Sequence, residues 1–515
     1  MAVTEATGKL GLSRSGWAFV MLLFPGLWLI RMATAWLSGS SLFIDEAQYW
    51  DWSRHLAWGY FSKPPVLPVL IKLSAAVGGD NAMGVRWLVQ ALWGLIPLIV
   101  WRLGWEMQRD SGLRLSQAHA TGAWAAALVS STLVFGILGQ VATTDGPLMF
   151  CWVVSIWLLW RALQQPEQWS RWVLLGLVLA VGVLSKYTMA AVLLSWAVWW
   201  MRQPRAHIFK GMVLAVLVAT LCWVPHLAWN HAHGWPTLKH TAELLTGASA
   251  SPAQALGTWA LRALEYVAGQ LLIAGPVVLV MAWRAFQASK WSHQTPEHSV
   301  NSPVVFAWHF TWPLWLVGAW QALQGNAQVN WPAPAWIGAC LVLAWWLATR
   351  PLIWRWSAPA IVVISSSLLC TVIGLGGDWR VRFGLPPLAE PWALWARAQG
   401  WDESFQAIQP QMEMHPDATL VALDRTVIAH AAYAWRVKGW TLQSWQRTPH
   451  PDHHYDLTSR FSPDANNPAH AKVLLVLQGP LPEFVQQHFG QVTQLHPMRA
   501  VGKDLHVWLL EQPKP

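Results

Sequence analysis

The sequence predicts a mostly α-helical protein, a polytopic transmembrane helical bundle followed by a small C-terminal α/β domain. Hydrophobic residues make up 54% of the 515 residues and charged residues only 11%, against about 25% in soluble domains. The mean hydropathy is +0.31. After about Gly376 the composition changes, because Asp, His, Pro and Gln become common and the apolar runs shorten. We therefore expect a membrane domain at 1–376 and a soluble domain at 377–515.

The use of aromatic, basic and sulfur-containing residues agrees with a membrane protein. The chain has 43 Trp against 6 Tyr, and Trp favours the membrane–water interface. The net charge of +9 comes mostly from short loops between apolar segments, so it predicts membrane topology and no nucleic-acid partner. The cysteines lie at unrelated spacings inside apolar segments, which favours packing over a disulfide framework or a thiolate metal site: Cys151, Cys222, Cys340 and Cys370.

About eleven segments have the roughly 20 mostly apolar residues that a spanning helix needs, and we expect about 11–13 spans. The first follows Lys9 and Arg14 without a clear small-residue cleavage site, which indicates a retained anchor. Two short segments flank residues 185–187 and form either one long helix or a broken pair. The predicted spans are 16–36, 83–103, 118–138, 147–163, 172–184, 189–201, 209–229, 263–283, 303–323, 331–348 and 352–373.

The distribution of Lys and Arg predicts the orientation. With the N-terminus in the cytoplasm, the inner loops hold most of these residues, and the C-terminal domain lies on the outer face. Nearly every unusual polar motif falls on that outer face. In the C-terminal domain, "ATLVALD", "AKVLLVLQG" and "DLHVWLLE" predict strands, and "RTVIAHAAYAWRVKG" predicts a helix that ends at Gly439.

The stretch "FIDEAQYWDW" places Asp45 and Glu46 directly after the first outer boundary. Acids near a helix start often cap it. Asp45 and Tyr49 would share one face of a helix, and a carboxylate at an apolar boundary is suited to act as a general base. Glu46 either positions its neighbour or caps the helix.

A lysine on a stiff loop follows in "GYFSKPPVLPVL". Pro64 and Pro65 favour an extended, rigid turn, so Lys63 lies beside Tyr60 at headgroup depth. Lys63 either snorkels to the interface or contacts a phosphate.

Two further ionisable residues lie at outer boundaries. Asp145 in "VATTDGPL" is either a turn residue or part of the site. Lys186 in "LSKYTM" lies between two apolar segments, where ionisable groups indicate function. The partners expected for Lys186 are Asp45, Asp145 or a bound phosphate.

Other polar residues leave alternatives open. The histidines of "HLAWNHAHGWPTLKHT" indicate either a metal site or an interfacial loop with substrate contacts, and "QGNAQVNWPAP" either caps a helix or recognises a sugar. A Walker loop, a GxGxxG after a strand and a DxD-like motif are absent from the sequence. An energised donor must therefore reach an outer site already anchored in the membrane. We expect no required cofactor, and a bound divalent metal is the alternative.

The motifs "IDEAQYW", "GYFSKPPVLPVLI", "TTDGPLMF" and "LSKYT", in this order, resemble those of bacterial polyprenyl-phosphate-dependent glycosyltransferases of the GT-C class. These enzymes are related to protein O-mannosyltransferases and to the lipid A aminoarabinose transferase. The resemblance covers residues 43–188 well. It implies a multi-pass protein of the bacterial inner membrane with a periplasmic active site. Its reaction would move one sugar, with inversion, from a polyprenyl-phosphate donor to a lipid, glycan or protein acceptor.

The same resemblance implies roles for seven residues. Asp45 matches the catalytic carboxylate and Asp145 the second outer-loop acid. The expected substrate-binding residues are Glu46, Tyr49, Tyr60, Lys63 and Lys186.

The chain departs from the lipid A aminoarabinose transferases at two positions. It has Gln48 where they have Arg, and Ser62 where they have a Glu that contributes to a metal site. We therefore predict no metal ligands, and leave the positive charge near the phosphate to Lys63 and Lys186. Both departures weigh against aminoarabinose as the sugar.

Two other functions remain as alternatives. A polyprenyl-linked glycan transporter or flippase would place its polar residues near the bilayer midplane, often in repeated halves, and here they gather at one face without a repeat. A non-catalytic assembly protein would bind the lipid carrier without transferring a sugar.

Overall fold

The computed structural model describes residues 14–38, 41–112, 114–202, 204–246, 256–289, 302–325, 328–348, 395–495 and 503–514, with 362, 364 and 384. The chain forms two compact units. Unit 1 comprises residues 1–34, 86–231 and 241–374, and unit 2 comprises 35–85, 232–240 and 375–515. The domain boundary expected at 376–377 and most of the span expected at 352–373 lie outside the described residues.

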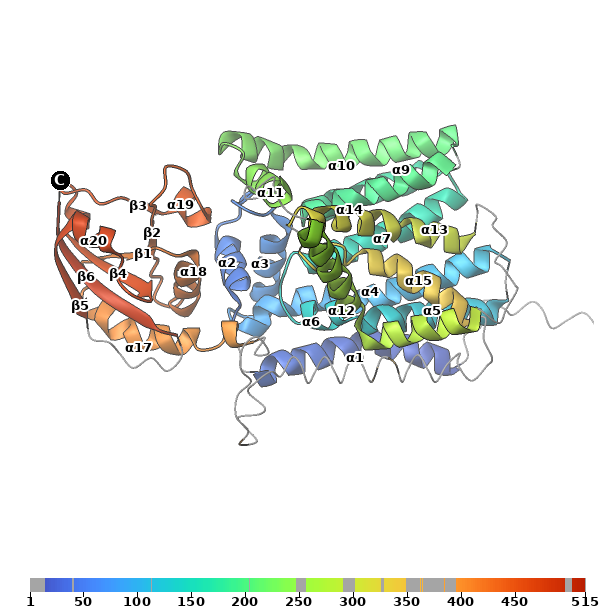
Figure 1. Ribbon diagram of the computed structural model, residues 1–515, viewed down its shortest axis with the longest axis horizontal. Helices are drawn as coiled ribbons and strands as arrows, with labels where there is room; N and C mark the ends of the chain where they lie inside the picture. Colours follow the sequence, from blue (N-terminus) through green and yellow to red (C-terminus); the bar gives the residue numbers. More distant parts are fainter. Residues whose placement is uncertain are drawn as a thin grey trace, which may run out of the picture. The chain divides into compact units, whose positions relative to one another are not determined.

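Unit 1 is a bundle of apolar helices (Figure 1). In the described part of the chain, four helices are long and apolar enough to cross a membrane, within Ala82–Asp110, Asp145–Gln164, Ala206–Ala232 and Trp259–Ala285. This confirms a mostly helical fold with multiple apolar helices. The helices with residues in unit 1 are α1 (Arg14–Ser38), α4 (Ala82–Asp110), α5 (Leu115–Ser131), α6 (Leu133–Leu138), α7 (Asp145–Gln164), α8 (Trp169–Val183), η1 (Tyr187–Ala191), α9 (Val192–Arg202), α10 (Ala206–Ala232), α11 (Pro236–Thr246), α12 (Leu256–Ser289), α13 (Pro303–His309), α14 (Trp312–Leu323) and α15 (Ala335–Ala348).

Several of these helices are broken where the sequence predicts continuous spans. Thr132 separates α5 from α6 in an extended conformation, and its hydroxyl accepts a hydrogen bond from the Phe135 N–H. Within α12, Gly275 adopts φ 77°, a backbone conformation that residues other than Gly rarely adopt. Pro276 follows it. A Cβ there would lie 3.1 Å from Leu133 Cγ. The break in α12 thus packs tightly against the start of α6.

The C-terminal part of unit 2 is built on a six-stranded sheet of order β3-β2-β1-β4-β6-β5 (Figure 1). The strands from β3 to β4 are parallel, and β6 and β5 are antiparallel to their neighbours. The predicted strands are confirmed as β1, β4 and β6. The predicted helix is present as α18, but it ends at Ala434 and is followed by turns up to Gly439. The bounds are η3 (Ala396–Ala398), α17 (Trp401–Met414), β1 (Thr419–Ala422), α18 (Arg425–Ala434), β2 (Gln443–Trp445), α19 (His454–Thr458), β3 (Arg460–Phe461), η4 (Pro468–His470), β4 (Lys472–Gln478), α20 (Glu483–His488), β5 (Phe489–Leu495) and β6 (Leu505–Pro513).

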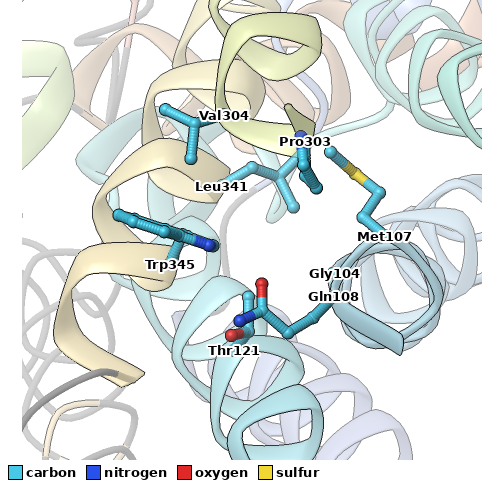
Figure 2. Close-up of a pocket in the computed structure, with 8 residues that line it drawn as sticks. All are labelled: Gly104, Met107, Gln108, Thr121, Pro303, Val304, Leu341 and Trp345. Atoms are coloured by element: carbon cyan, nitrogen blue, oxygen red, sulfur yellow. The ribbon is translucent and has the colours of Figure 1, made fainter. Parts of the chain in front are cut away.

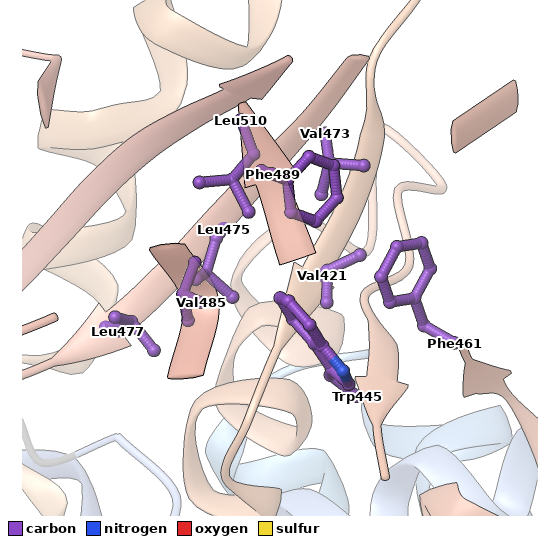
Figure 3. Packing of buried hydrophobic residues seen from close by; sticks show 9 residues of the cluster. All are labelled: Val421, Trp445, Phe461, Val473, Leu475, Leu477, Val485, Phe489 and Leu510. Atoms are coloured by element: carbon purple, nitrogen blue, oxygen red, sulfur yellow. The ribbon is translucent and has the colours of Figure 1, made fainter. Parts of the chain in front are cut away.

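A hydrophobic core supports one face of this sheet (Figure 3). The central strand β4 reads KVLLVLQ, with five consecutive buried residues, because a central strand is covered on both faces. The aromatic rings of Trp445 and Phe461 pack edge to face at 5.5 Å. The cluster comprises Val421, Trp445, Phe461, Val473, Leu475, Leu477, Val485, Phe489 and Leu510.

Two helices from the N-terminal half of the chain belong to unit 2, namely α2 (Ile44–Arg54) and α3 (Val66–Gly78). Helix α2 packs against α18, where the Trp50 ring meets the Tyr433 ring edge to face at 5.2 Å. The Arg436 Nε donates a hydrogen bond to the Asp80 carbonyl at 2.9 Å. The acidic motif is therefore supported by the C-terminal domain.

Candidate functional site

The first turn of α2 carries two acids with opposite environments. The Asp45 side chain is 51% exposed, whereas Glu46 is fully buried. One Glu46 oxygen accepts the Phe43 backbone N–H at 3.0 Å, as a residue at this position does when it caps a helix. The structure therefore supports the capping interpretation of Glu46, and its substrate-binding role stays a prediction.

The predicted tyrosines Tyr49 and Tyr60 belong to one aromatic cluster around Trp52. Tyr49 is 4% exposed and its ring lies 5.3 Å from that of Trp52. The Tyr60 ring stacks on the Trp52 ring at 4.5 Å, with the two planes 2° apart. Although Asp45 and Tyr49 are one helical turn apart as expected, only Asp45 is exposed. Tyr49 supports the helix in this structure, and its contact with a donor stays a prediction.

The Tyr60 hydroxyl is used within the fold. It donates to the Trp52 carbonyl at 3.2 Å and accepts the Ala57 N–H at 3.1 Å. Burial raises the pKa of Tyr60 to about 12. A buried hydroxyl already engaged with the backbone fixes the turn after α2, and a phosphate contact by Tyr60 stays a prediction.

The loop that carries Lys63 is held from several sides. The Tyr60 N–H donates to the Lys63 carbonyl at 3.1 Å, and the Thr237 hydroxyl donates to the Tyr60 carbonyl at 2.5 Å. Pro64 and Pro65 are buried, and α3 begins at the next residue. This agrees with the stiff turn expected for Lys63, whose contact with a phosphate stays a prediction.

An arginine from the C-terminal domain reaches the acidic turn. Arg425 Nη1 lies 3.3 Å from Asp45 Oδ1 and donates to Gln48 Oε1 at 2.6 Å. Arg425 is the first residue of α18, after Asp424, whose side chain caps that helix by accepting the Thr426 N–H. Sequence reasoning did not identify Arg425, although a polar residue directly after a predicted strand is a usable signal.

Helix α19 of the C-terminal domain contributes His454 to the aromatic cluster. The His454 ring lies 4.9 Å from Trp52 and 5.5 Å from Tyr60. Burial, with His453 and His233 nearby, lowers the pKa of His454 to about 3. Burial also raises the pKa of Asp51, which is on the same helix as Trp52. We therefore expect the interior of this part of unit 2 to be sensitive to protonation.

Unit 1 holds the other predicted pair. Lys186 Nζ and Asp145 Oδ1 form an ion pair at 2.8 Å, with side chains 13% and 9% exposed. Asn330 donates to the second Asp145 oxygen at 3.3 Å. Asp145 starts α7 and Lys186 lies extended between α8 and η1. Of the partners expected for Lys186, the structure shows Asp145.

A polar cluster begins one residue after Lys186. The Tyr187 hydroxyl and His226 Nε2 are 2.5 Å apart, and the Asn230 amide lies 3.1 Å from the same nitrogen. His226 and Asn230 are fully buried on α10. Of the four histidines in "HLAWNHAHGWPTLKHT", His226 is thus part of a hydrogen-bonded cluster with Tyr187 and Asn230.

The structure gathers the predicted residues within each unit. Asp45, Glu46, Tyr49, Tyr60 and Lys63 belong to unit 2, and Asp145 and Lys186 to unit 1.

Among the described residues, no three or more His, Cys, Asp or Glu side chains are placed to hold a metal ion. A small, mostly apolar pocket in unit 1 is lined by α4, α5, α13 and α15 (Figure 2). It contains none of the seven predicted residues.

Similarity to known proteins extends over most of the chain. The sequence profile of a family described as dolichyl-phosphate-mannose-protein mannosyltransferase matches residues 62–229. The chain is 26% identical over 329 residues to the lipid A galacturonosyltransferase RgtD of Rhizobium johnstonii, covering 64% of this chain and 65% of that protein. It is 30% identical over 241 residues to the undecaprenyl phosphate-alpha-4-amino-4-deoxy-L-arabinose arabinosyl transferase of Pseudomonas paraeruginosa, covering 42% of this chain and 41% of that protein. The chain thus matches less than two thirds of the length of either relative.

Similarity of fold covers nearly the whole chain. The crystal structure of ArnT from Cupriavidus metallidurans bound to undecaprenyl phosphate aligns with a TM-score of 0.63 at 13% identity, over 96% of this chain and 98% of that one. The apo state of the same protein aligns with a TM-score of 0.62.

Proposed function

We propose that this chain, which resembles polyprenyl-phosphate-dependent membrane glycosyltransferases of the GT-C class in motifs, sequence and fold, is itself an inverting glycosyltransferase. It moves a single sugar from a polyprenyl-phosphate donor to a lipid acceptor at the outer face of the bacterial inner membrane. The C-terminal domain lies in the periplasm. The acceptor class is suggested by the name of one curated relative, the lipid A galacturonosyltransferase, and the donor class by the name of the other.

The exposure of Asp45 carries this proposal. Helix α2 buries Glu46, Ala47, Gln48, Tyr49 and Trp50 in succession, and leaves the carboxylate of Asp45 open. Asp45 is not needed as a helix cap, because Glu46 already accepts the Phe43 N–H. An exposed acid on a rigid, buried helix is suited to hold an acceptor hydroxyl in a fixed geometry.

The reaction requires only side-chain chemistry. The acceptor oxygen attacks C1 of the donor sugar and forms the new glycosidic bond, while the bond from C1 to the phosphate oxygen breaks and its electron pair stays on the phosphate. Asp45 takes the proton of the acceptor hydroxyl. General-base help of this kind is typically worth about 10²–10⁴-fold in rate. Lys63 stabilises the charge that develops on the departing phosphate.

The test is sugar transfer by the purified full chain in nanodiscs, with a radiolabelled polyprenyl-phosphate sugar and extracted envelope lipids. We expect Asp45→Asn to reduce the rate by at least about 100-fold with unchanged folding. The matched control is Asp80→Asn, which neutralises another exposed acid of unit 2, the partner of Arg54, and retains transfer. Normal transfer by Asp45→Asn would remove Asp45 from the mechanism.

The wild-type result separates the competing functions. Radiolabel that moves from donor to acceptor in detergent, where no bilayer divides two compartments, supports an enzyme and excludes a transporter. Binding of the donor without transfer to any envelope lipid, glycan or protein would instead support an assembly protein. Mass spectrometry of envelope glycolipids from cells with and without the protein then identifies the sugar and the acceptor.

A further inference from the structure

The acidic turn of α2 receives a cation from a distant part of the chain. Arg425 contacts Asp45 and Gln48, although 380 residues separate Arg425 from Asp45 in sequence. The first turn of α2 contains two acids, and its basic residue, Arg54, lies in the last turn. A carboxylate that acts as a base beside a phosphate repels it, so a cation between the two groups lowers the electrostatic cost of bringing them together.

The geometry of Arg425 leaves donors for such a phosphate. Both contacts use Nη1, whereas a guanidinium carries five N–H donors in a planar fork. Among the described residues, neither Nε nor Nη2 of Arg425 has a hydrogen-bond partner, and its side chain is 40% exposed. Arginine is suited to bind two phosphate oxygens at once with such an edge.

The fold fixes the position of this arginine. Arg425 opens α18, three residues after Ala422 ends β1 at its carboxyl end. Strand β1 pairs with β2 on one side and with β4 on the other, so the chain leaves β1 at the point where strand order reverses. Open α/β sheets bind ligands at this location. Gln48, which is 2% exposed, holds Nη1 from the side of α2.

We propose that Arg425 is a phosphate-binding residue, supplied by the C-terminal domain to the turn that carries Asp45. It supplies the cation that α2 lacks at position 48. Gln48 and Asp45 orient one end of the guanidinium, and the remaining donors bind the phosphate of the polyprenyl carrier. This inference rests on the proposed function, because that function makes the ligand a lipid phosphate.

The experiment measures binding of undecaprenyl phosphate to the full chain in nanodiscs, with undecaprenol as the lipid without phosphate. We expect Arg425→Ala to weaken binding of undecaprenyl phosphate by about 10-fold or more, since it removes hydrogen bonds to a charged group. Binding of undecaprenol is expected to stay unchanged. Arg425→Lys should recover part of the loss, because it restores the charge without the planar fork.

Two further variants separate phosphate binding from docking of the domain. Arg436→Ala removes another arginine through which the C-terminal domain contacts the N-terminal part of unit 2, at the Asp80 carbonyl, and should leave binding of undecaprenyl phosphate unchanged. The double variant Gln48→Arg with Arg425→Ala places a cation on α2 itself and should restore binding. Equal effects of Arg425→Ala on both lipids, or a matching loss in Arg436→Ala, would overturn the proposal.

Unchanged binding of undecaprenyl phosphate by Arg425→Ala would also overturn it. Because binding is measured without any sugar, an absence of transfer by the wild type counts against the glycosyltransferase alone. The two proposals therefore fail separately.

Discussion

Adjacent residues of α2 differ in what they contribute. Asp45 and Glu46 have the same charge and follow each other in the chain, yet one is open to solvent and the other is buried on the Phe43 N–H. The sequence predicted that this pair is important and left the role of Glu46 open. Helical rotation of about 100° per residue separates the two side chains, and only the packing of α2 determines which one is covered.

A pair of substitutions at Glu46 tests its capping role. We expect Glu46→Gln to keep the acceptor for the Phe43 N–H and to retain most of the stability and transfer rate. Glu46→Ala removes the acceptor and should destabilise the protein by about 1–3 kcal/mol, as for other buried donors left unsatisfied. Thermal unfolding in detergent and the transfer assay measure both effects. Loss of transfer by a stable Glu46→Gln would instead indicate contact with substrate.

At the scale of elements, the ion pair in unit 1 explains a break that the sequence left undecided. Residues 184–186 separate α8 from η1. The backbone of Lys186 is extended, and its amine pairs with Asp145 at the start of α7. Each carboxylate oxygen has a partner, Lys186 on one and Asn330 on the other. The break between α8 and η1 thus lies at a buried ion pair, where the segments that carry Lys186, Asp145 and Asn330 meet.

We expect Lys186→Met to destabilise the protein by about 3–5 kcal/mol, because it leaves the Asp145 charge buried without its counter-charge. Adding Asp145→Asn to this variant should recover part of the loss, because it removes the unpaired charge. Lys210→Met, which neutralises an exposed lysine of the same unit, serves as the control. Thermal unfolding in detergent measures all variants, and wild-type stability of Lys186→Met would contradict a structural role for the pair.

Sequence patterns predicted elements better than they predicted contacts. Long apolar runs marked the helices of unit 1, and short ones marked β1, β4 and β6, because burial of whole segments leaves a local signature. The strands β2 and β3 have only three and two residues, too few to show a period. The contact of Arg425 with Asp45 has no local signature either, since it depends on how α18 packs against α2.

At the scale of the whole molecule, unit 2 joins segments from three parts of the chain, 35–85, 232–240 and 375–515. The composition change near Gly376 predicted a separate C-terminal domain, but gave no indication that α2 packs against it or that α3 belongs to the same unit. The connection is visible only in three dimensions, where rings of Trp52 and Tyr60 contact His454. A change at His454 therefore affects the segments that carry Asp45 and Lys63.

This arrangement predicts that unit 2 is sensitive to acid. His454 has a pKa of about 3 in the folded protein against about 6.5 when unfolded, so the unfolded state binds more protons below pH 6.5. The contribution of neutral His454 to the free energy of unfolding is therefore fully present above pH 6.5, and it is lost as the pH drops toward 3. Between pH 7 and 4.5 the loss from this residue is on the order of 3 kcal/mol. The raised pKa of Asp51 has the opposite sign and offsets part of this loss in acid.

Hydrogen exchange at pH 7 and after brief incubation at pH 4.5 measures the effect in peptides from α2 and α19. In the wild type, acid should increase exchange in both. His454→Phe keeps an aromatic ring against Trp52 but cannot be protonated, so it should make exchange in these peptides less dependent on pH. His450→Phe, at an exposed position of the same domain, should leave the dependence unchanged. An equal response to acid in wild type and His454→Phe would show that protonation of His454 does not open this part of unit 2, and would assign any acid sensitivity to other groups.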